Sequence, residues 1–147
     1  MKDLKIRLIK NSSEYNQIVK IRTVVFVKEQ KVPRDIEMDE YENISKHVIV
    51  FYGKKAVGCG RLRFLRGKAK LERIAVMKRY RNKGFGTRIL MYMVNYAKRK
   101  NPKEIYMHAQ YYLKNYYKKL GFKQTGKIFY EAGIKHIKMH LVSKKSR

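Results

Sequence analysis

The stretch of residues 69–109 constrains the fold most, because its side-chain period changes twice. Residues 69–76 alternate like a strand, residues 84–99 have the spacing of an amphipathic helix, and residues 105–109 form a second apolar strand pattern. A strand, a helix and a strand in succession make a crossover unit, which joins two parallel strands of one sheet. The sequence therefore predicts at least one parallel pair.

Shorter strand patterns with glycine turns flank this unit on both sides. Residues 47–52 and 56–65 precede it, and residues 122–130 and 134–142 follow it. Such patterns are typical of antiparallel hairpins. A strand over residues 4–9, a helix capped by Asn11 and a short helix over residues 112–120 complete the chain, whereas residues 31–45 look irregular. We predict a mixed α/β (α+β) domain in the order β-α-βββ-α-β-α-ββ, with a mostly antiparallel sheet and helices on both faces.

The length and charge of the chain limit the classes of protein to which it can belong. The 147 residues fit a single domain, 1–147, and no linker divides them. Lys and Arg number 37 against 11 Asp and Glu, a formal charge of +26 that favours polyanions. No run of 18 apolar residues predicts a membrane span, and residues 1–10 lack the apolar core of a secretory signal. With one cysteine, Cys59, for which we expect a structural role, the sequence predicts a cytoplasmic protein without membrane contact.

The segment Arg81–Gly86, Arg-Asn-Lys-Gly-Phe-Gly, lies between the strand 69–76 and the helix that follows. Two glycines at i and i+2 let backbone N–H groups approach a ligand, and a helix N-terminus adds unpaired donors and partial positive charge. Together they predict an anion site. It is neither a P-loop nor a dinucleotide fingerprint, since Ile89 stands at the third glycine position. An ordinary glycine-rich turn at a helix start is the alternative.

Two motifs resemble those of the GNAT acetyltransferases. Arg81–Gly86 matches the family's Arg/Gln-x-x-Gly-x-Gly/Ala loop, and the segment from Gln110 through Tyr117 to Leu120-Gly121-Phe122 resembles its second signature. Residues 22–39, 108–110 and 129–139 are also similar to the ElaA/YjcF-like subgroup. Leu113 in place of the usual alanine and the excess of lysine are departures from the pattern.

The resemblance implies the family fold, acetyl-CoA as co-substrate and no metal. It implies transfer of an acetyl group to a primary amine of a small molecule or peptide, by a monomer or homodimer. Cofactor contacts are expected at the end of the strand, in the loop and in the second signature: Ile74, Ala75, Val76, Arg81, Asn82, Lys83, Gly84, Phe85, Gly86, Thr87, Gln110 and Tyr117.

The resemblance also suggests catalytic roles. Tyr117 stands where the family places a general acid beside the coenzyme A sulfur; a core tyrosine is the alternative. Glu72 is the first candidate for general base, and a salt bridge with a nearby arginine is its alternative. Glu29 and Glu131 follow as candidates for the base.

Six of the eleven acidic residues fall within residues 29–42. An acidic patch on a basic protein attracts cations, so we expect Glu29, Glu37 and Asp39 to border a basic acceptor. The alternative is that these carboxylates neutralise nearby cations or lie on a solvated loop.

Two other functions compete with this prediction. A nucleic-acid-binding module would use the +26 charge and stack bases on Tyr111, Tyr112, Tyr116 and Tyr117, although no nucleic-acid-binding signature is present. A protein that binds acetyl-CoA without catalysis is the other. His136 and His140 lie on a strand without acids at metal spacing, and His47 and His108 are expected to be packed strand residues.

Overall fold

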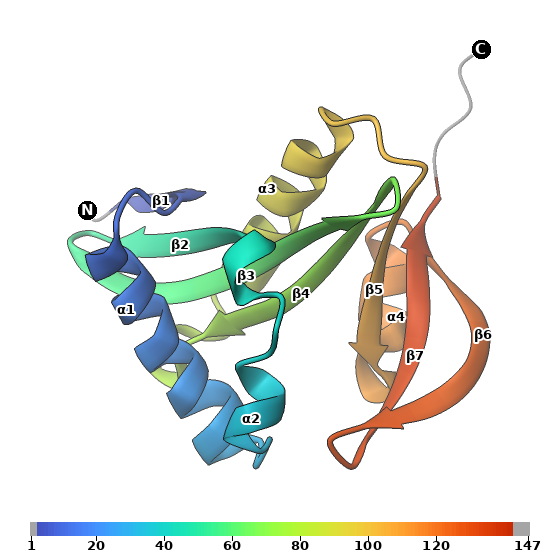
Figure 1. Cartoon of the computed structure of the whole chain (residues 1–147), viewed down its shortest axis with the longest axis horizontal. Coiled ribbons are helices and arrows are strands. Elements are labelled where there is room, and N and C mark those ends of the chain that lie inside the picture. Colours follow the sequence, from blue (N-terminus) through green and yellow to red (C-terminus); the bar gives the residue numbers. More distant parts are fainter. Residues whose placement is uncertain (1–2, 143–147) are drawn as a thin grey trace.

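The computed structural model of the chain describes residues 3–142, so the basic tail 143–147 lies outside the described residues. Seven strands form one sheet in the order β1-β2-β3-β4-β5-β7-β6 (Figure 1). The strands are β1 (Leu4–Leu8), β2 (Lys46–Tyr52), β3 (Lys55–Leu65), β4 (Lys68–Val76), β5 (Glu104–Gln110), β6 (Phe122–Glu131) and β7 (Ile134–Leu141). The α-helices are α1 (Ser12–Arg22), α2 (Arg34–Glu37), α3 (Phe85–Lys98) and α4 (Lys114–Lys119).

The sheet confirms the predicted crossover. β4 and β5 pair in parallel, whereas every other neighbouring pair of strands is antiparallel. The predicted order of main elements is also confirmed, with short helical turns added between them.

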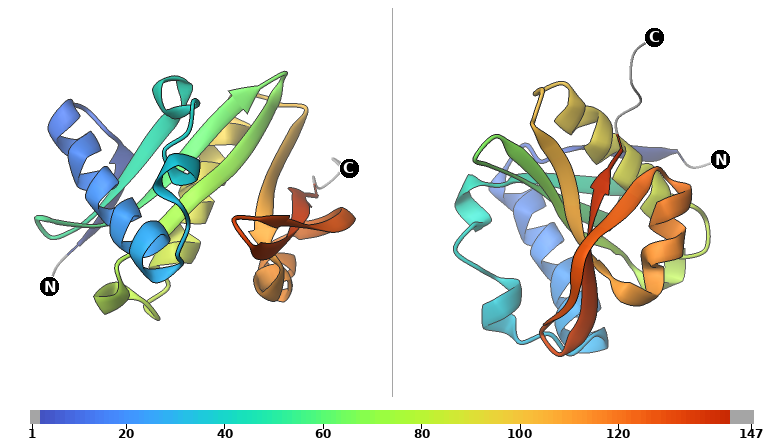
Figure 2. Two further views of the ribbon diagram at one scale, coloured as in Figure 1. Left: turned by 60° about the horizontal axis from the view of Figure 1, so that its bottom comes forward. Right: turned by 90° about the vertical axis from the view of Figure 1, so that its right-hand side faces the viewer.

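Helices cover both faces of the sheet, as predicted. Ile18 and Ile21 of α1 pack with Ile49 and Cys59 on one face. The other face carries α3 and α4 (Figure 2, right), and the larger core there is centred on Ile89 and other buried side chains of α3. The N-terminus of α3 follows the C-terminal end of β4 after a short 3₁₀ turn over Lys78–Tyr80.

Glycines on β3 let α3 approach the sheet closely. A Cβ atom at Gly60 would lie 2.5 Å from Sδ of Met93, and one at Gly58 would lie 3.2 Å from Cδ1 of Ile89. Both distances are shorter than ordinary van der Waals contact. Larger residues at either position would push α3, and the loop before it, away from β4.

β4 carries a bulge in its pairing with β3, and it separates from β5 along its second half. Cys59 faces Ala75 and Arg61 faces Glu72, so two residues of β4 oppose one of β3. Arg73, within this bulge, has φ of +57°, in the left-handed region that non-glycine residues rarely adopt. β4 pairs with β5 only from Lys68 to Lys70, and the two strands diverge beyond that point (Figure 1).

The first helix ends differently from the prediction. The helical pattern continues past α1 as a π-helix over Thr23–Glu29. Four of its seven residues are β-branched and lose side-chain freedom in an α-helix, which favours the change. The segment expected to be irregular contains α2 and a 3₁₀ turn over Glu42–Ile44, and α4 begins after a 3₁₀ turn over Tyr111–Leu113.

Candidate active site

The divergence of β4 and β5 creates a cavity of about 510 Å³. Side chains of β4 and β5 form its two walls, the end of the π-helix and residues 36–39 border it on one side, and α4 and the β6–β7 turn border it on the other. Because β4 has no strand partner toward β5 beyond Lys70, the main-chain groups of its second half face this opening. A bound molecule here can accept and donate hydrogen bonds along a free strand edge.

A glycine cradle lies at the end of that edge, where α3 begins. Gly84 has φ of +79° at the N-cap of α3, and a Cβ atom at Gly84 or Gly86 would meet no other atom within 4 Å. The first backbone N–H groups of a helix have no intrahelical acceptor. The space that the glycines leave open therefore lies beside backbone donors of the kind that can bind an anion.

Arg81 holds the loop before α3 in place. Its Nε donates to the carbonyl oxygen of Val76 at 2.8 Å, and its Nη2 pairs with Oε1 of Glu29 at 2.7 Å. The guanidinium thus fastens the end of the π-helix to the end of β4. Glu29 is absent from the lining of the cavity, so the structure does not bring it to the expected border of the acceptor.

Helix α4 lies against the start of α3. The hydroxyls of Thr87 and Tyr116 are in hydrogen-bond contact, which ties the two helices together beside the glycine cradle. The next residue, Tyr117, lines the cavity, and its hydroxyl has no hydrogen-bond partner within residues 3–142. Burial raises the pKa of Tyr117 to about 12, so the phenol is protonated at neutral pH and can donate.

Gln110 connects two elements that line the cavity. Its Nε2 donates to Oε1 of Gln30 at 3.0 Å, which joins β5 to the residue that follows the π-helix. The amide therefore connects the two halves of the molecule across the site.

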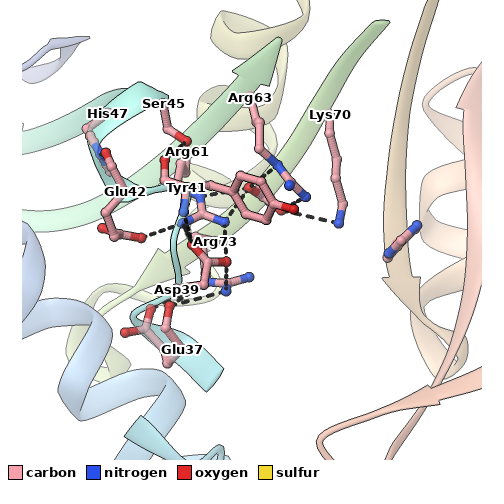
Figure 3. A network of polar contacts seen from close by, with 12 residues as sticks. Glu37, Asp39, Tyr41, Glu42, Ser45, His47, Arg61, Arg63, Lys70 and Arg73 are labelled. Atoms are coloured by element: carbon pink, nitrogen blue, oxygen red, sulfur yellow. Dashed lines mark hydrogen bonds and ion pairs between the residues drawn. The ribbon is translucent and has the colours of Figure 1, made fainter. Parts of the chain in front are cut away.

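Arginines pair with four acids of the span 29–42, namely Glu29, Glu37, Asp39 and Glu42. Nη1 and Nη2 of Arg61 bind the two carboxylate oxygens of Asp39 at 2.8 and 2.9 Å (Figure 3). Arg22 binds Glu37 and Glu42. Arg73 reaches Asp39 at 3.2 Å. Burial alone would raise the pKa of Asp39, but the hydrogen bonds from Arg61 and the Tyr41 N–H outweigh it and lower the pKa to about 2.

This pairing is the alternative that the sequence left open for these acids. Glu37 and Asp39 line the cavity, yet their carboxylates are held by buried arginines, and the side chain of Glu37 is 2% exposed. The expected attraction for a cationic acceptor is therefore largely cancelled. The pairs instead fasten residues 37–42 to α1 and the sheet.

Glu72 is also engaged in ion pairs. Its Oε2 accepts from Nε of Arg61 at 2.7 Å, and Arg63 and Lys70 lie 3.3 Å from its carboxylate. Its side chain lines the cavity but is only 7% exposed. The carboxylate thus has three cationic partners around the oxygens that a general base would need.

Two histidines and a carboxylate lie on the opposite wall. Nδ1 of His108 is 3.0 Å from Oε2 of Glu131, and Nε2 of His136 is 3.8 Å from Oε1 of the same side chain. The hydrogen bond from His108 is the main reason that the pKa of Glu131 is lowered. Phe129 packs edge-on against His108 and stacks on His136.

Comparisons with known proteins place this geometry in a family. Residues 10–143 match the model of the acetyltransferase (GNAT) domain. The chain belongs to the GNAT acetyltransferase family. It is 39% identical over 137 residues to the uncharacterized N-acetyltransferase YjcF of Bacillus subtilis, covering 92% of this chain and 98% of YjcF. Membership of this family makes the chain an acyltransferase.

Two solved structures share the fold. Escherichia coli ElaA superposes with a TM-score of 0.83 and 20% identity, over 97% of this chain and 100% of that one. A GNAT family acetyltransferase from Elizabethkingia anophelis with acetyl-CoA bound superposes with a TM-score of 0.64 and 18% identity, over 93% and 94% of the two chains.

The residues expected to contact the cofactor differ in where the structure places them. Ala75 and Phe85 are buried in the cores on either side of the sheet, so only their main-chain groups can face a ligand. Asn82, with φ of +63°, and Lys83 are exposed on the loop. Ile74, Gln110 and Tyr117 line the cavity with their side chains.

Several lining residues of this GNAT domain escaped the sequence prediction. Lys70 shares a face with Glu72 by the period of a strand, and Arg63 lies on the neighbouring strand β3. Burial lowers the pKa of Lys70. The alternating pattern of β4 could have predicted that Lys70 lines the cavity. No sequence pattern indicated that Gln30 and Phe26 do so.

Other predictions concern metals and inert residues. Within the described part of the chain, no group of three or more His, Cys, Asp or Glu is placed to hold a metal ion. Burial raises the pKa of Cys59 to about 12, which keeps its thiol protonated and unreactive. None of the helices in residues 3–142 is long and apolar enough to cross a membrane.

Proposed function

We propose that this GNAT domain transfers the acetyl group of acetyl-CoA directly to a primary amine. One arrangement carries the proposal: the unpaired edge of β4 and the Tyr117 side chain border the cavity, and the glycine cradle at the start of α3 follows the end of β4. The open space at Gly84 and Gly86 fits a pyrophosphate, and the main-chain groups of Ile74 and Val76 suit the amide-rich pantetheine arm. The structure of the acetyl-CoA-bound Elizabethkingia relative supports the same choice of co-substrate.

Each step of the transfer has a candidate group. The free donors at the start of α3, with the positive charges of Lys83 and Arg88, would hold the pyrophosphate. Arg81 would act by bracing the loop through Val76 and Glu29. Gln110 would position the pantetheine end of the cofactor, and Asn82, Phe85 and Thr87 would contribute main-chain contacts.

Tyr117 is proposed to assist departure of the coenzyme A thiolate. A phenol with a pKa of about 12 is a weaker acid than a thiol, whose pKa is about 8.5 in free cysteine. Full proton transfer to sulfur is therefore uphill by roughly 3 to 4 pKa units. The hydroxyl acts best as a hydrogen-bond donor that stabilises the developing negative charge on sulfur.

A thiol-release screen tests the proposed function. Acetyl-CoA is incubated with the protein and with separate sets of small amines, amino acids, polyamines and basic peptides, and free coenzyme A is measured with a thiol reagent. The proposal expects acceptor-dependent release for at least one primary amine and an acetyl amide in the product by mass spectrometry. Calorimetry measures acetyl-CoA binding in parallel.

The competing functions give different results in this screen. Acetyl-CoA binding without release for any acceptor would favour a binding protein. Absence of acetyl-CoA binding together with tight, steeply salt-dependent association with nucleic acid would favour the nucleic-acid module. Either result would overturn the proposal.

A further inference from the structure

We propose that His108, held by Glu131, is the general base that takes the proton from the acceptor amine. This inference rests on the proposed function, because it assigns a residue to one step of that reaction. The sequence motifs did not assign a catalytic role to His108.

The position of His108 suits this step. Pairing between β4 and β5 ends at Tyr106, so His108 lies two residues into the part of β5 that borders the cavity. Its side chain is 28% exposed. A base on this part of β5 can reach a substrate that enters the cavity between β4 and β5.

The ring is fixed in orientation. Nδ1 contacts the Glu131 carboxylate at 3.0 Å, and the Phe129 ring meets the imidazole edge-on with centroids 4.9 Å apart. Nε2 has no hydrogen-bond partner among the residues that the structure describes. An imidazole whose Nδ1–H donates to a carboxylate keeps the lone pair of Nε2 free to accept a proton. The same carboxylate then stabilises the imidazolium, as in other histidine–carboxylate pairs.

Glu72 is less suited to the same role. Arg61, Arg63 and Lys70 surround its carboxylate at 2.5 to 3.3 Å. These cations occupy the oxygen lone pairs and repel an approaching ammonium group. We therefore assign Glu72 to the ion pairs that hold β3 and β4 together and assign the base to the other wall.

Several charged groups surround the pair formed by His108 and Glu131. The titratable and charged groups that face it or its pair come from five strands and one helix: Tyr106, Glu131, His136, Lys138, Lys70, Glu72, Arg63 and Tyr117. Glu131 is the anion in direct contact with the ring. The cations on the opposite wall favour the neutral amine over the ammonium form, which helps the proton to leave.

The proposed reaction conserves atoms and charge. The ammonium group of the acceptor gives one proton to Nε2 of His108, and the freed nitrogen lone pair attacks the thioester carbonyl carbon. The tetrahedral intermediate collapses with cleavage of the carbon–sulfur bond. The departing sulfur, hydrogen-bonded to Tyr117, takes up the second nitrogen proton, and His108 releases the first to water. The products are an acetyl amide, coenzyme A thiol and one proton.

Three variants test the assignment with an acceptor found in the screen. His108→Gln removes the basic nitrogen, and His140→Gln is the matched control because His140 lies on β7 outside the cavity lining. Glu131→Gln removes the charge that positions His108 but keeps a hydrogen-bond acceptor. Acceptor kcat/KM is measured from pH 6 to pH 10 at saturating acetyl-CoA, with melting temperature and acetyl-CoA affinity as checks.

We expect His108→Gln to lose roughly 10²-fold or more in kcat/KM near neutral pH, the scale of a lost general base. The loss should shrink toward high pH, where the amine deprotonates without help. Glu131→Gln should lose less and shift the pH profile, and His140→Gln should match the wild type. His108→Asn repeats the test should the glutamine variant melt early.

Two outcomes distinguish failure of the proposed function from failure of the base assignment alone. If the wild type shows no acceptor-dependent release, the proposed function fails and the base assignment falls with it. If the wild type is active and both His108 variants keep its kcat/KM and pH profile, only the base assignment is overturned. A loss of kcat/KM in Glu72→Gln at an unchanged melting temperature, with none in His108→Gln, would return the role to Glu72.

Discussion

Replacement of Tyr117 by phenylalanine removes one hydroxyl and leaves the ring. Because that hydroxyl has no protein partner within residues 3–142, the melting temperature and acetyl-CoA affinity should stay close to wild type. The pKa of about 12 rules against full proton transfer, which would cost about 5 kcal/mol for a thiol of ordinary pKa. A hydrogen bond to a charged group contributes about 1.5–3 kcal/mol. The chemical step should therefore slow by roughly 10- to 150-fold.

The assay must isolate the chemical step. Rapid mixing of excess protein with acetyl-CoA, followed by acceptor, measures a single turnover without product release. Tyr92→Phe is the control, since it makes the same change on α3, outside the cavity lining. Tyr116→Phe serves less well because the Tyr116 hydroxyl contacts Thr87 beside the glycine cradle. A Tyr117→Phe variant with the wild-type single-turnover rate would refute the reasoning.

Three further predictions test the cofactor loop, the ion pairs and the core. Gly86→Val places a side chain in open space that we assign to the pyrophosphate, so calorimetry should show acetyl-CoA affinity at least about tenfold weaker in a folded protein, with Gly86→Ala intermediate. Asp39→Asn should lower the free energy of unfolding by about 1–3 kcal/mol, whereas the exposed Asp35→Asn should not. Since the folded-state pKa of Asp39 is depressed to about 2, its contribution is complete above about pH 4 and is lost as the pH falls through about 2; acid titrations of both variants check this. Gly60→Ala should cost about 1–3 kcal/mol in urea denaturation by crowding Met93, and the added substitution Met93→Ala should cost less in that background than alone.

The sequence predicted the order of elements well because hydrophobic period and glycine turns are local properties. Residues 69–109 alone predicted the parallel pair. The bulge at Arg73 was missed, since its positive φ is imposed by the register between β3 and β4 and has no glycine to mark it. The π-helix was missed for a similar reason, because its period differs only slightly from that of the predicted helix.

The candidate site was predicted unevenly. The loop at Gly84 and Gly86 follows from local sequence. The partners of the acidic residues do not, because Arg61 lies 22 residues from Asp39 and Arg81 lies 52 from Glu29. The contact between His108 and Glu131 depends on the strand order β5-β7-β6, which brings residues 23 apart to one wall.

The pairing of most carboxylates with basic side chains determines how the thermal stability of the protein depends on salt. Within residues 3–142, seven of the eleven acids pair with arginine or lysine, namely Glu14, Glu29, Glu37, Asp39, Glu42, Glu72 and Glu104. The pairs of Glu37, Glu42 and Glu72 with Arg22 and Arg61 are the buried ones. Little negative charge is left to offset the outer lysines. Added salt screens exposed charges strongly and buried pairs weakly. Ionic strength should therefore relieve the mutual repulsion of the lysines more than it weakens the buried ion pairs, and the folded protein should tolerate heat better in concentrated than in dilute buffer.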